Sequence, residues 1–151
     1  MTEKTTFFHS AAIYRFDDRL LVVPYERTRD GVRRGMATLA IVSLEDPHEI
    51  GIKVLAMLDR CADNVPDDYS RGPAPSTAVI LRETKQRSWS AFHRKALLLG
   101  VYREVGARQL EITPTRRAGG GSEDVDDKTR ISGDDPKEIG RTVLAALSDA
   151  G

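Results

Sequence analysis

The sequence has little cysteine, histidine or aromatic residue. Its 151 residues include one cysteine, Cys61, and three histidines, and aromatics make up 6%. A lone cysteine excludes an internal disulfide and agrees with a reducing compartment. No run approaches the ~20 apolar residues that a membrane-spanning helix needs. The opening MTEKTTFFHSAAIYRF carries charge at Glu3 and Lys4, unlike a secretion signal. These absences predict a cytoplasmic protein with no membrane partner.

The same shortage leaves no arrangement of residues suited to catalysis. His9, His48 and His93 are far apart in the sequence, and no Cys or His pair has the spacing of a zinc site. Acids rather than Lys-Ser or Lys-Thr follow the triple glycine 119–121, which disfavours a phosphate-binding loop. We therefore expect no enzyme activity, no metal and no cofactor.

The chain also lacks a surplus of charge of either sign, since 23 Lys and Arg balance 23 Asp and Glu. The charges are nevertheless segregated. Residues 82–117 hold nine basic residues against three acids, whereas residues 118–151 hold four against eight. A dedicated nucleic-acid binder usually has a basic surplus. Nucleic acid is therefore not the expected partner. The charge segregation still allows a basic patch on one face of the protein.

What the sequence does contain is an internal repeat. SLEDPHEIGIKVLAMLD at 43–59 matches SGDDPKEIGRTVLAALS at 132–148 at ten of seventeen positions, with a constant offset of 89. Each copy opens with Asp, Pro and Glu in the order that caps a helix: Asp at the N-cap, Pro at the first helical position and Glu in the first turn. The capping residues are Asp46, Pro47, Glu49, Asp135, Pro136 and Glu138. The repeat predicts two equivalent helices, the first at 47–62.

Both expected helices share an apolar stripe and an interior glycine. In the first copy the stripe is Ile50, Val54 and Leu58, and the second copy repeats it 89 residues later. Gly51 and Gly140 each cost about 1 kcal/mol relative to Ala inside a helix. Because both copies accept this cost at the same place, we expect a close approach of each helix to the sheet or to its symmetry mate.

The remaining pattern predicts strands before each helix. RLLVVPY at 19–25 and RQLEITPT at 108–115 each have a short apolar strand closing on a proline, Pro24 or Pro114. Further strands are expected at 11–16, 36–42, 78–82, 97–102 and 129–132. A short helix is expected at 88–96, and irregular connections at 63–77 and 118–127. The fold class is thus α+β, a single domain over 1–151 with antiparallel sheet, packed helices and pseudo-symmetric repeats at about 11–62 and 97–149.

Two acid-rich connections are the candidate binding residues. The first candidates are Glu123, Asp124, Asp126 and Asp127, and the second are Asp67, Asp68 and Tyr69. An acidic arm would steer a basic partner, and Tyr is a favoured interface residue. The alternative for the first group is a solvated face that only aids solubility. Trp89 and Phe92 are expected in the core rather than on a base-stacking platform.

Three segments together resemble a known family. They are FFHSAAIYRFDDRLLVVP at 7–24, SWSAFHRKA at 88–96 and RISGDDPKEIGRTVLAALSDAG at 130–151. The likeness, which spans most of the chain, is to the immunity proteins of contact-dependent growth inhibition systems (CdiI). It implies a Whirly-like fold and a small bacterial protein that binds the C-terminal toxin domain of a cognate CdiA effector, commonly a nuclease, and blocks its active site. The family supplies no catalytic residues.

The alternative hypothesis is a single-stranded nucleic-acid-binding protein of Whirly-like fold. It would use the basic segment 82–117, with Trp89, Phe92 and Tyr102 as stacking groups. The neutral total charge of the chain counts against it.

Overall fold

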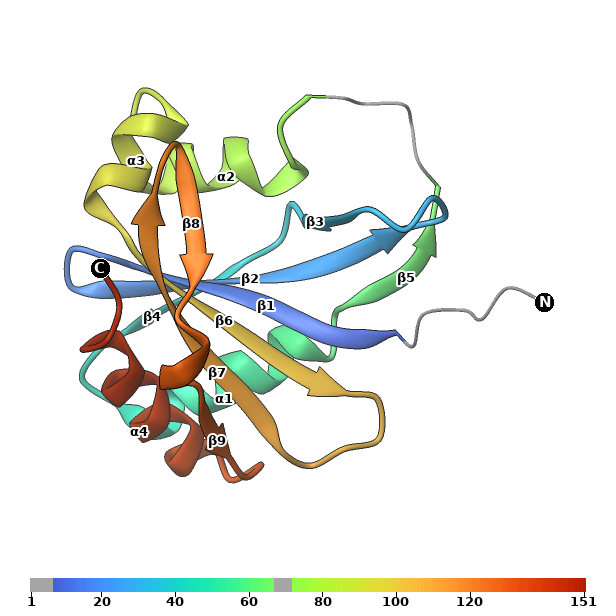
Figure 1. Cartoon of the computed structure of the whole chain (residues 1–151), viewed down its shortest axis with the longest axis vertical. Helices are drawn as coiled ribbons and strands as arrows, with labels where there is room; N and C mark the ends of the chain where they lie inside the picture. The colour runs from blue at the N-terminus through green and yellow to red at the C-terminus, as the bar shows by residue number, and fades with distance from the viewer. Residues whose placement is uncertain (1–6, 67–71) are drawn as a thin grey trace.

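The protein has an α+β fold in which helices pack on a curled sheet, four of them in the described residues (Figure 1). The computed structural model describes residues 7–66 and 72–151. In this part of the chain nine strands form the sheet, with the order β3-β2-β1-β6-β7-β8. Strands β4 and β5 also pair with β2, and β9 with β7. All pairings are antiparallel except that of β5 with β2.

The predicted repeat extends to every strand that precedes the two matched helices. The first set is β1 (Phe8–Phe16), β2 (Arg19–Thr28), β3 (Arg33–Gly35), β4 (Ala40–Ser43) and α1 (Pro47–Leu58). The second set is β6 (Leu97–Glu104), β7 (Leu110–Ala118), β8 (Gly121–Asp124), β9 (Arg130–Ser132) and α4 (Pro136–Leu147). A shift of 89 residues carries α1 onto α4 without a difference at either end, and it brings each strand within two residues of its counterpart's start.

The two repeats meet at the β1–β6 ladder, which is itself symmetric. Ala11 pairs with Val101, and Ala12 pairs with Gly100. The shift of 89 residues relates Ala11 to Gly100 and Ala12 to Val101. The repeat therefore relates each of these two pairs to the other. An approximate twofold axis therefore passes between them, at the centre of the sheet.

Both proline positions differ from prediction, because β2 and β7 continue beyond Pro24 and Pro114. The outer edge of β2 pairs with β4 up to Val22 and with β3 from Tyr25 onward. Pro24 lies in the gap, where its carbonyl accepts from Met36 N at 2.9 Å. Pro114 likewise accepts from Val125 N at 2.9 Å. A residue without an N–H is tolerated where the outer neighbour changes, so each proline marks a change of partner.

The capping prediction is confirmed for both helices. The carboxylate of Asp46 accepts from the N–H groups of His48 and Glu49, and that of Asp135 accepts from Glu138 N at 3.0 Å. The first-turn glutamates do not close a reciprocal capping box, since Glu138 accepts instead from Gly133 N and Glu49 pairs with Lys53. Helix α1 also ends four residues early, because residues from Ala62 enter β5 (Ala62–Val65).

The sheet carries a buried core on each face. On one face, residues such as Ile13, Leu99 and Ile112 pack against the apolar stripes of α1 and α4. On the other, Tyr14 and Phe16 pack with Ile80 of α2 (Pro75–Thr84) and Phe92 of α3 (Trp89–Lys95). Phe92 is fully buried and Trp89 packs on this second core, as predicted.

The segment at 78–82 corrects the predicted strand, because it lies within helix α2. The buried residues of α2 are Ser76, Ile80 and Thr84, which recur every four residues, as expected for one face of a helix. Pro75 occupies the first turn, and Lys85 ends the helix in the left-handed region at φ 56°. The short run AVIL cannot by itself separate a buried strand from a helix. The strand expected at 36–42 is likewise shorter, since only β4 forms there.

Candidate functional site

The acidic segment at 118–127, expected as an irregular connection, forms a hairpin. Strand β8 pairs with β7, with Glu123 opposite Arg116 and Asp124 opposite Thr115. Gly119 turns the chain at φ +58°, a conformation that favours glycine. Asp126 and Asp127 follow in a single 3₁₀ turn, Asp126–Lys128. All four predicted acids are exposed.

The four acids have different electrostatic surroundings. Glu123 forms an ion pair with Arg116 across the hairpin. Partial burial, and then the neighbouring charge of Asp126, raise the pKa of Asp124. Burial and the charge of Asp124 raise the pKa of Tyr102, on β6. The charges of Asp124 and Asp126 thus act on one another and on Tyr102, and neither aspartate has an ion pair among the described residues.

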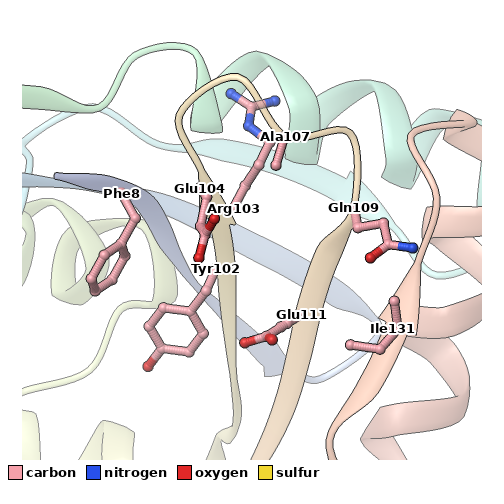
Figure 2. Close-up of a pocket in the computed structure, with 8 residues that line it drawn as sticks. All are labelled: Phe8, Tyr102, Arg103, Glu104, Ala107, Gln109, Glu111 and Ile131. Atoms are coloured by element: carbon pink, nitrogen blue, oxygen red, sulfur yellow. The ribbon is translucent and has the colours of Figure 1, made fainter. Parts of the chain in front are cut away.

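Tyr102 also lines a groove of about 410 Å³ at the ends of β1, β6, β7 and β9 (Figure 2). The register places five lining side chains on the face opposite α1 and α4, because Tyr102 pairs with Glu111 and Glu111 with Ile131, while Phe8 pairs with Glu104. The rings of Phe8 and Tyr102 meet edge to face with centroids 6.0 Å apart. Arg103, Ala107 and Gln109 complete the lining.

This groove combines apolar contact area with free carboxylates. Ile131 is 55% exposed, and Phe8 and Tyr102 are half-buried. Glu104 and Glu111 are exposed and have no ion pair within the part of the chain that the structure describes. Figure 2 shows Arg103 directed away from the two glutamates. It binds Asp59 at 2.9 Å and His9 Nδ1 at 2.8 Å on the other side of the sheet.

Strand β3, the counterpart of β8 in the first repeat, carries two arginines, whereas β8 carries two acids. The shift of 89 places Arg34 of β3 at the position of Glu123. Arg34 pairs with Glu26 at 2.9 Å. Arg33 lies over the ring of Phe8, 3.8 Å from its centroid, and donates to the Phe8 carbonyl at 3.3 Å. The repeats therefore share a backbone, while their outer strands β3 and β8 differ in the sign of their charges.

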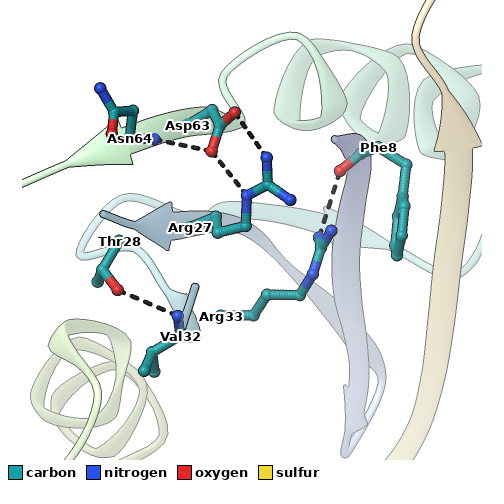
Figure 3. Close-up of polar contacts among 7 residues, drawn as sticks. All are labelled: Phe8, Arg27, Thr28, Val32, Arg33, Asp63 and Asn64. Carbon is teal, nitrogen blue, oxygen red and sulfur yellow. Dashed lines mark hydrogen bonds and ion pairs between the residues drawn. The ribbon is translucent and has the colours of Figure 1, made fainter. Parts of the chain in front are cut away.

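An ion pair between Arg27 and Asp63 joins strand β2, beside β3, to strand β5. The guanidinium donates to both carboxylate oxygens, at 2.7 and 2.8 Å (Figure 3). The hydrogen bond from Arg27 lowers the pKa of Asp63. Since Asp63 lies in β5, the pair fixes β5 beside β2.

Helices α2 and α3, which lie between the two repeats in the sequence, contact both hairpins. Ser76 of α2 lies against Gly35 of β3. At the other hairpin, His93 Nε2 is 2.8 Å from Ser122 Oγ, and Arg117 donates to the carbonyls of His93 and Ala96 at 3.0 and 2.6 Å. These contacts position the acidic hairpin on a packed scaffold.

Only some of the binding residues predicted from the sequence can be located near the groove. Asp124 and Asp126 lie near Tyr102, whereas Asp67, Asp68 and Tyr69 lie outside the described residues. Sequence reasoning missed Phe8, Glu104, Glu111 and Ile131 as possible binding residues. One available signal was Glu111, a carboxylate in the middle of the apolar strand LEIT.

The single thiol of the chain is bound within the fold. Burial raises the pKa of the Cys61 thiol, which donates to the Ser10 carbonyl at 3.1 Å. A thiol held in the protonated form is a poor nucleophile. Residues 7–66 and 72–151 contain no group of three or more His, Cys, Asp and Glu placed to hold a metal ion. No helix in these ranges is long and apolar enough to cross a membrane.

The comparisons with known proteins support the fold. No family model and no curated protein matches the sequence. A protein of unknown function from Neisseria meningitidis has a similar structure, with a TM-score of 0.78 and 18% identity over 100% of both chains. A chain of the CdiA-CT/CdiI toxin and immunity complex from Yersinia pseudotuberculosis has a TM-score of 0.76 and 14% identity, over 98% of this chain and 100% of that one. At these identities the likeness establishes the fold.

Proposed function

We propose that the protein is an immunity protein that binds the C-terminal toxin domain of a CdiA effector and occludes its active site. The observation that carries the proposal is the full-length likeness to a chain of a toxin and immunity complex. The likeness to the CdiI family in the sequence supports it independently of the structural comparison. In this role the protein is not an enzyme, acts in the cytoplasm of the producing bacterium and needs no cofactor.

The acidic hairpin supports a nuclease as the toxin. A nuclease active site must attract phosphate, so it tends to be cationic, and an acidic surface complements it. Asp124 and Asp126 supply such a surface beside Tyr102. The α3 contacts to Ser122 and Arg117 hold the hairpin in place.

The test is protection of a cell that makes the toxin. The proposal predicts that the gene of a CdiA effector ends immediately upstream. The C-terminal domain of that effector would be expressed with and without this protein, and growth and complex formation would be measured. We expect growth only with this protein and a complex that co-purifies. Cell death despite equal expression of a folded protein, or no complex between the purified partners, would reject the proposal.

The alternative, a single-strand nucleic-acid binder, has less support. Of its proposed stacking groups, Phe92 is fully buried, and Trp89 packs edge to face on Tyr14 with ring centroids 5.9 Å apart. A stacking platform needs exposed aromatic faces. Arg117, in the basic segment, is bound to backbone carbonyls.

A further inference from the structure

We propose that the groove beside Tyr102 is the docking site for an arginine- or lysine-bearing segment of the partner protein. This inference rests on the proposed function and deepens it, because it assigns the contact surface. The groove is distinct from the acidic hairpin singled out in the sequence, although Asp124 links the two through Tyr102.

The charge of the groove selects a cationic occupant. Glu104 and Glu111 lie on one face and have no ion pair among the described residues. Of the nearby cations, Arg103 is bound to Asp59 and His9, whereas Arg33 lies over the ring of Phe8 and keeps its charge at that end of the groove. Asp124 adds a third carboxylate next to Tyr102. A guanidinium or ammonium group entering here would meet carboxylates that need no rearrangement.

The apolar side chains of the groove suit the aliphatic stem of Arg or Lys. Ile131 is 55% exposed at one end, and the rings of Phe8 and Tyr102 form the other. Long basic side chains bury their stems on apolar surface while the charged head stays with polar groups. The groove therefore offers both parts of such a side chain a partner.

Other occupants fit less well. Phosphate groups of a nucleic acid would be repelled by Glu104 and Glu111. A second copy of this chain would have to supply an unpaired arginine, and two of those at the β2–β3 corner, Arg34 and Arg27, are already paired with Glu26 and Asp63. A basic segment of a different protein remains, and a cationic nuclease surface supplies one.

The experiment uses two double variants with the same change of charge. E104K/E111K reverses the groove, and E45K/D134K reverses two exposed acids at the starts of α1 and α4. The probe is the toxin domain encoded upstream, with its affinity measured by calorimetry. We expect the groove variant to lose on the order of 100-fold in affinity, because like charges in contact cost several kcal/mol, and the control to stay within about 3-fold.

Each outcome decides a separate question. Failure of the unmodified protein to bind the toxin domain rejects the proposed function itself. Tight binding by the unmodified protein together with equal binding by both variants overturns the groove alone. A change of oligomeric state in E104K/E111K with no change in toxin binding would assign the groove to a second copy and also overturn the proposal.

A second measurement tests the groove proposal without a variant, in case E104K/E111K does not fold. Amide chemical shifts of the unmodified protein would be followed as the toxin domain is added. We expect the largest changes at Phe8, Tyr102, Glu111 and Ile131. Changes confined to α1 and α4, on the opposite face, would overturn the assignment.

Discussion

Gly51 and Gly140 occupy equivalent places in the crossing of α1 and α4, and each faces the backbone of the other helix's first turn. A Cβ on Gly51 would overlap the carbonyl oxygen of Pro136, and one on Gly140 would overlap that of Pro47. The reciprocity follows from the twofold relation of the repeats. Of the two close approaches predicted for these glycines, the structure shows the one to the symmetry-related helix and not the one to the sheet.

We expect Gly51→Ala and Gly140→Ala each to destabilise the protein. Alanine gains about 1 kcal/mol of helix propensity, but overpacking costs typically 1–3 kcal/mol and more where backbone cannot move. The net loss should be roughly 2 kcal/mol in the free energy of unfolding, measured by urea denaturation. Gly120→Ala is the control, because a Cβ there has open space. Wild-type stability in either helix variant would contradict this packing.

We expect Asp124→Lys with Asp126→Lys to slow association with the toxin domain while leaving the fold intact. The hairpin acids are exposed, and exposed substitutions usually cost within about 0.5 kcal/mol. Charges at the rim of an interface act mainly on the association rate and its salt dependence. Stopped-flow kinetics at low and high salt would measure both, with E45K/D134K as the control. An unchanged rate at low salt would exclude a steering role for the hairpin.

We expect His9 to make the protein less stable as the pH falls below about 6.5, the unperturbed value for histidine. Burial, and then the charge of Arg103, lower the pKa of His9 in the folded state. The unfolded chain therefore binds the proton first, and stability is lost between about 6.5 and the folded pKa. Because a guanidinium only donates, Nδ1 accepts from Arg103 and the neutral ring carries its proton on Nε2.

Melting curves at about pH 7.5 and about pH 5 would test the histidine prediction. His9→Gln should reduce the loss at the lower pH, whereas His48→Gln removes an exposed histidine from the first turn of α1 and serves as the control. Equal pH dependence in the His9 variant and the wild type would contradict it. The Nε2–H tautomer can be checked from the ring nitrogen shifts by NMR.

We expect the isolated protein to bind oligonucleotides only weakly, with dissociation constants of about 10⁻⁴ to 10⁻⁶ M at physiological salt. The net charge is zero, and the aromatic residues of the basic segment include the buried Phe92. Fluorescence anisotropy with labelled single-stranded RNA and DNA would measure the affinity. Nanomolar binding at that salt would favour the nucleic-acid hypothesis over the immunity hypothesis.

Local signals account for the parts of the fold that the sequence predicted correctly. The Asp-Pro caps and four-residue apolar spacing specify α1 and α4, because capping and helical periodicity act within a few residues. The short helix expected at 88–96 also begins with a local cap, since the hydroxyl of Ser88 accepts from Ala91 N at 3.1 Å. The repeat, read at a constant offset, also predicted the twofold relation between the halves.

Tertiary structure alone decided the rest. The AVIL run lies in helix α2, where Ile80 packs in the second core and the buried residues of the helix recur every four positions. The groove joins Phe8, Tyr102, Glu111 and Ile131, which only the ladder register brings to one face. The sequence by itself determined two equivalent capped helices and their strands. Which residues share a surface was decided by strand pairing, because contacts between distant segments depend on register rather than on local propensity.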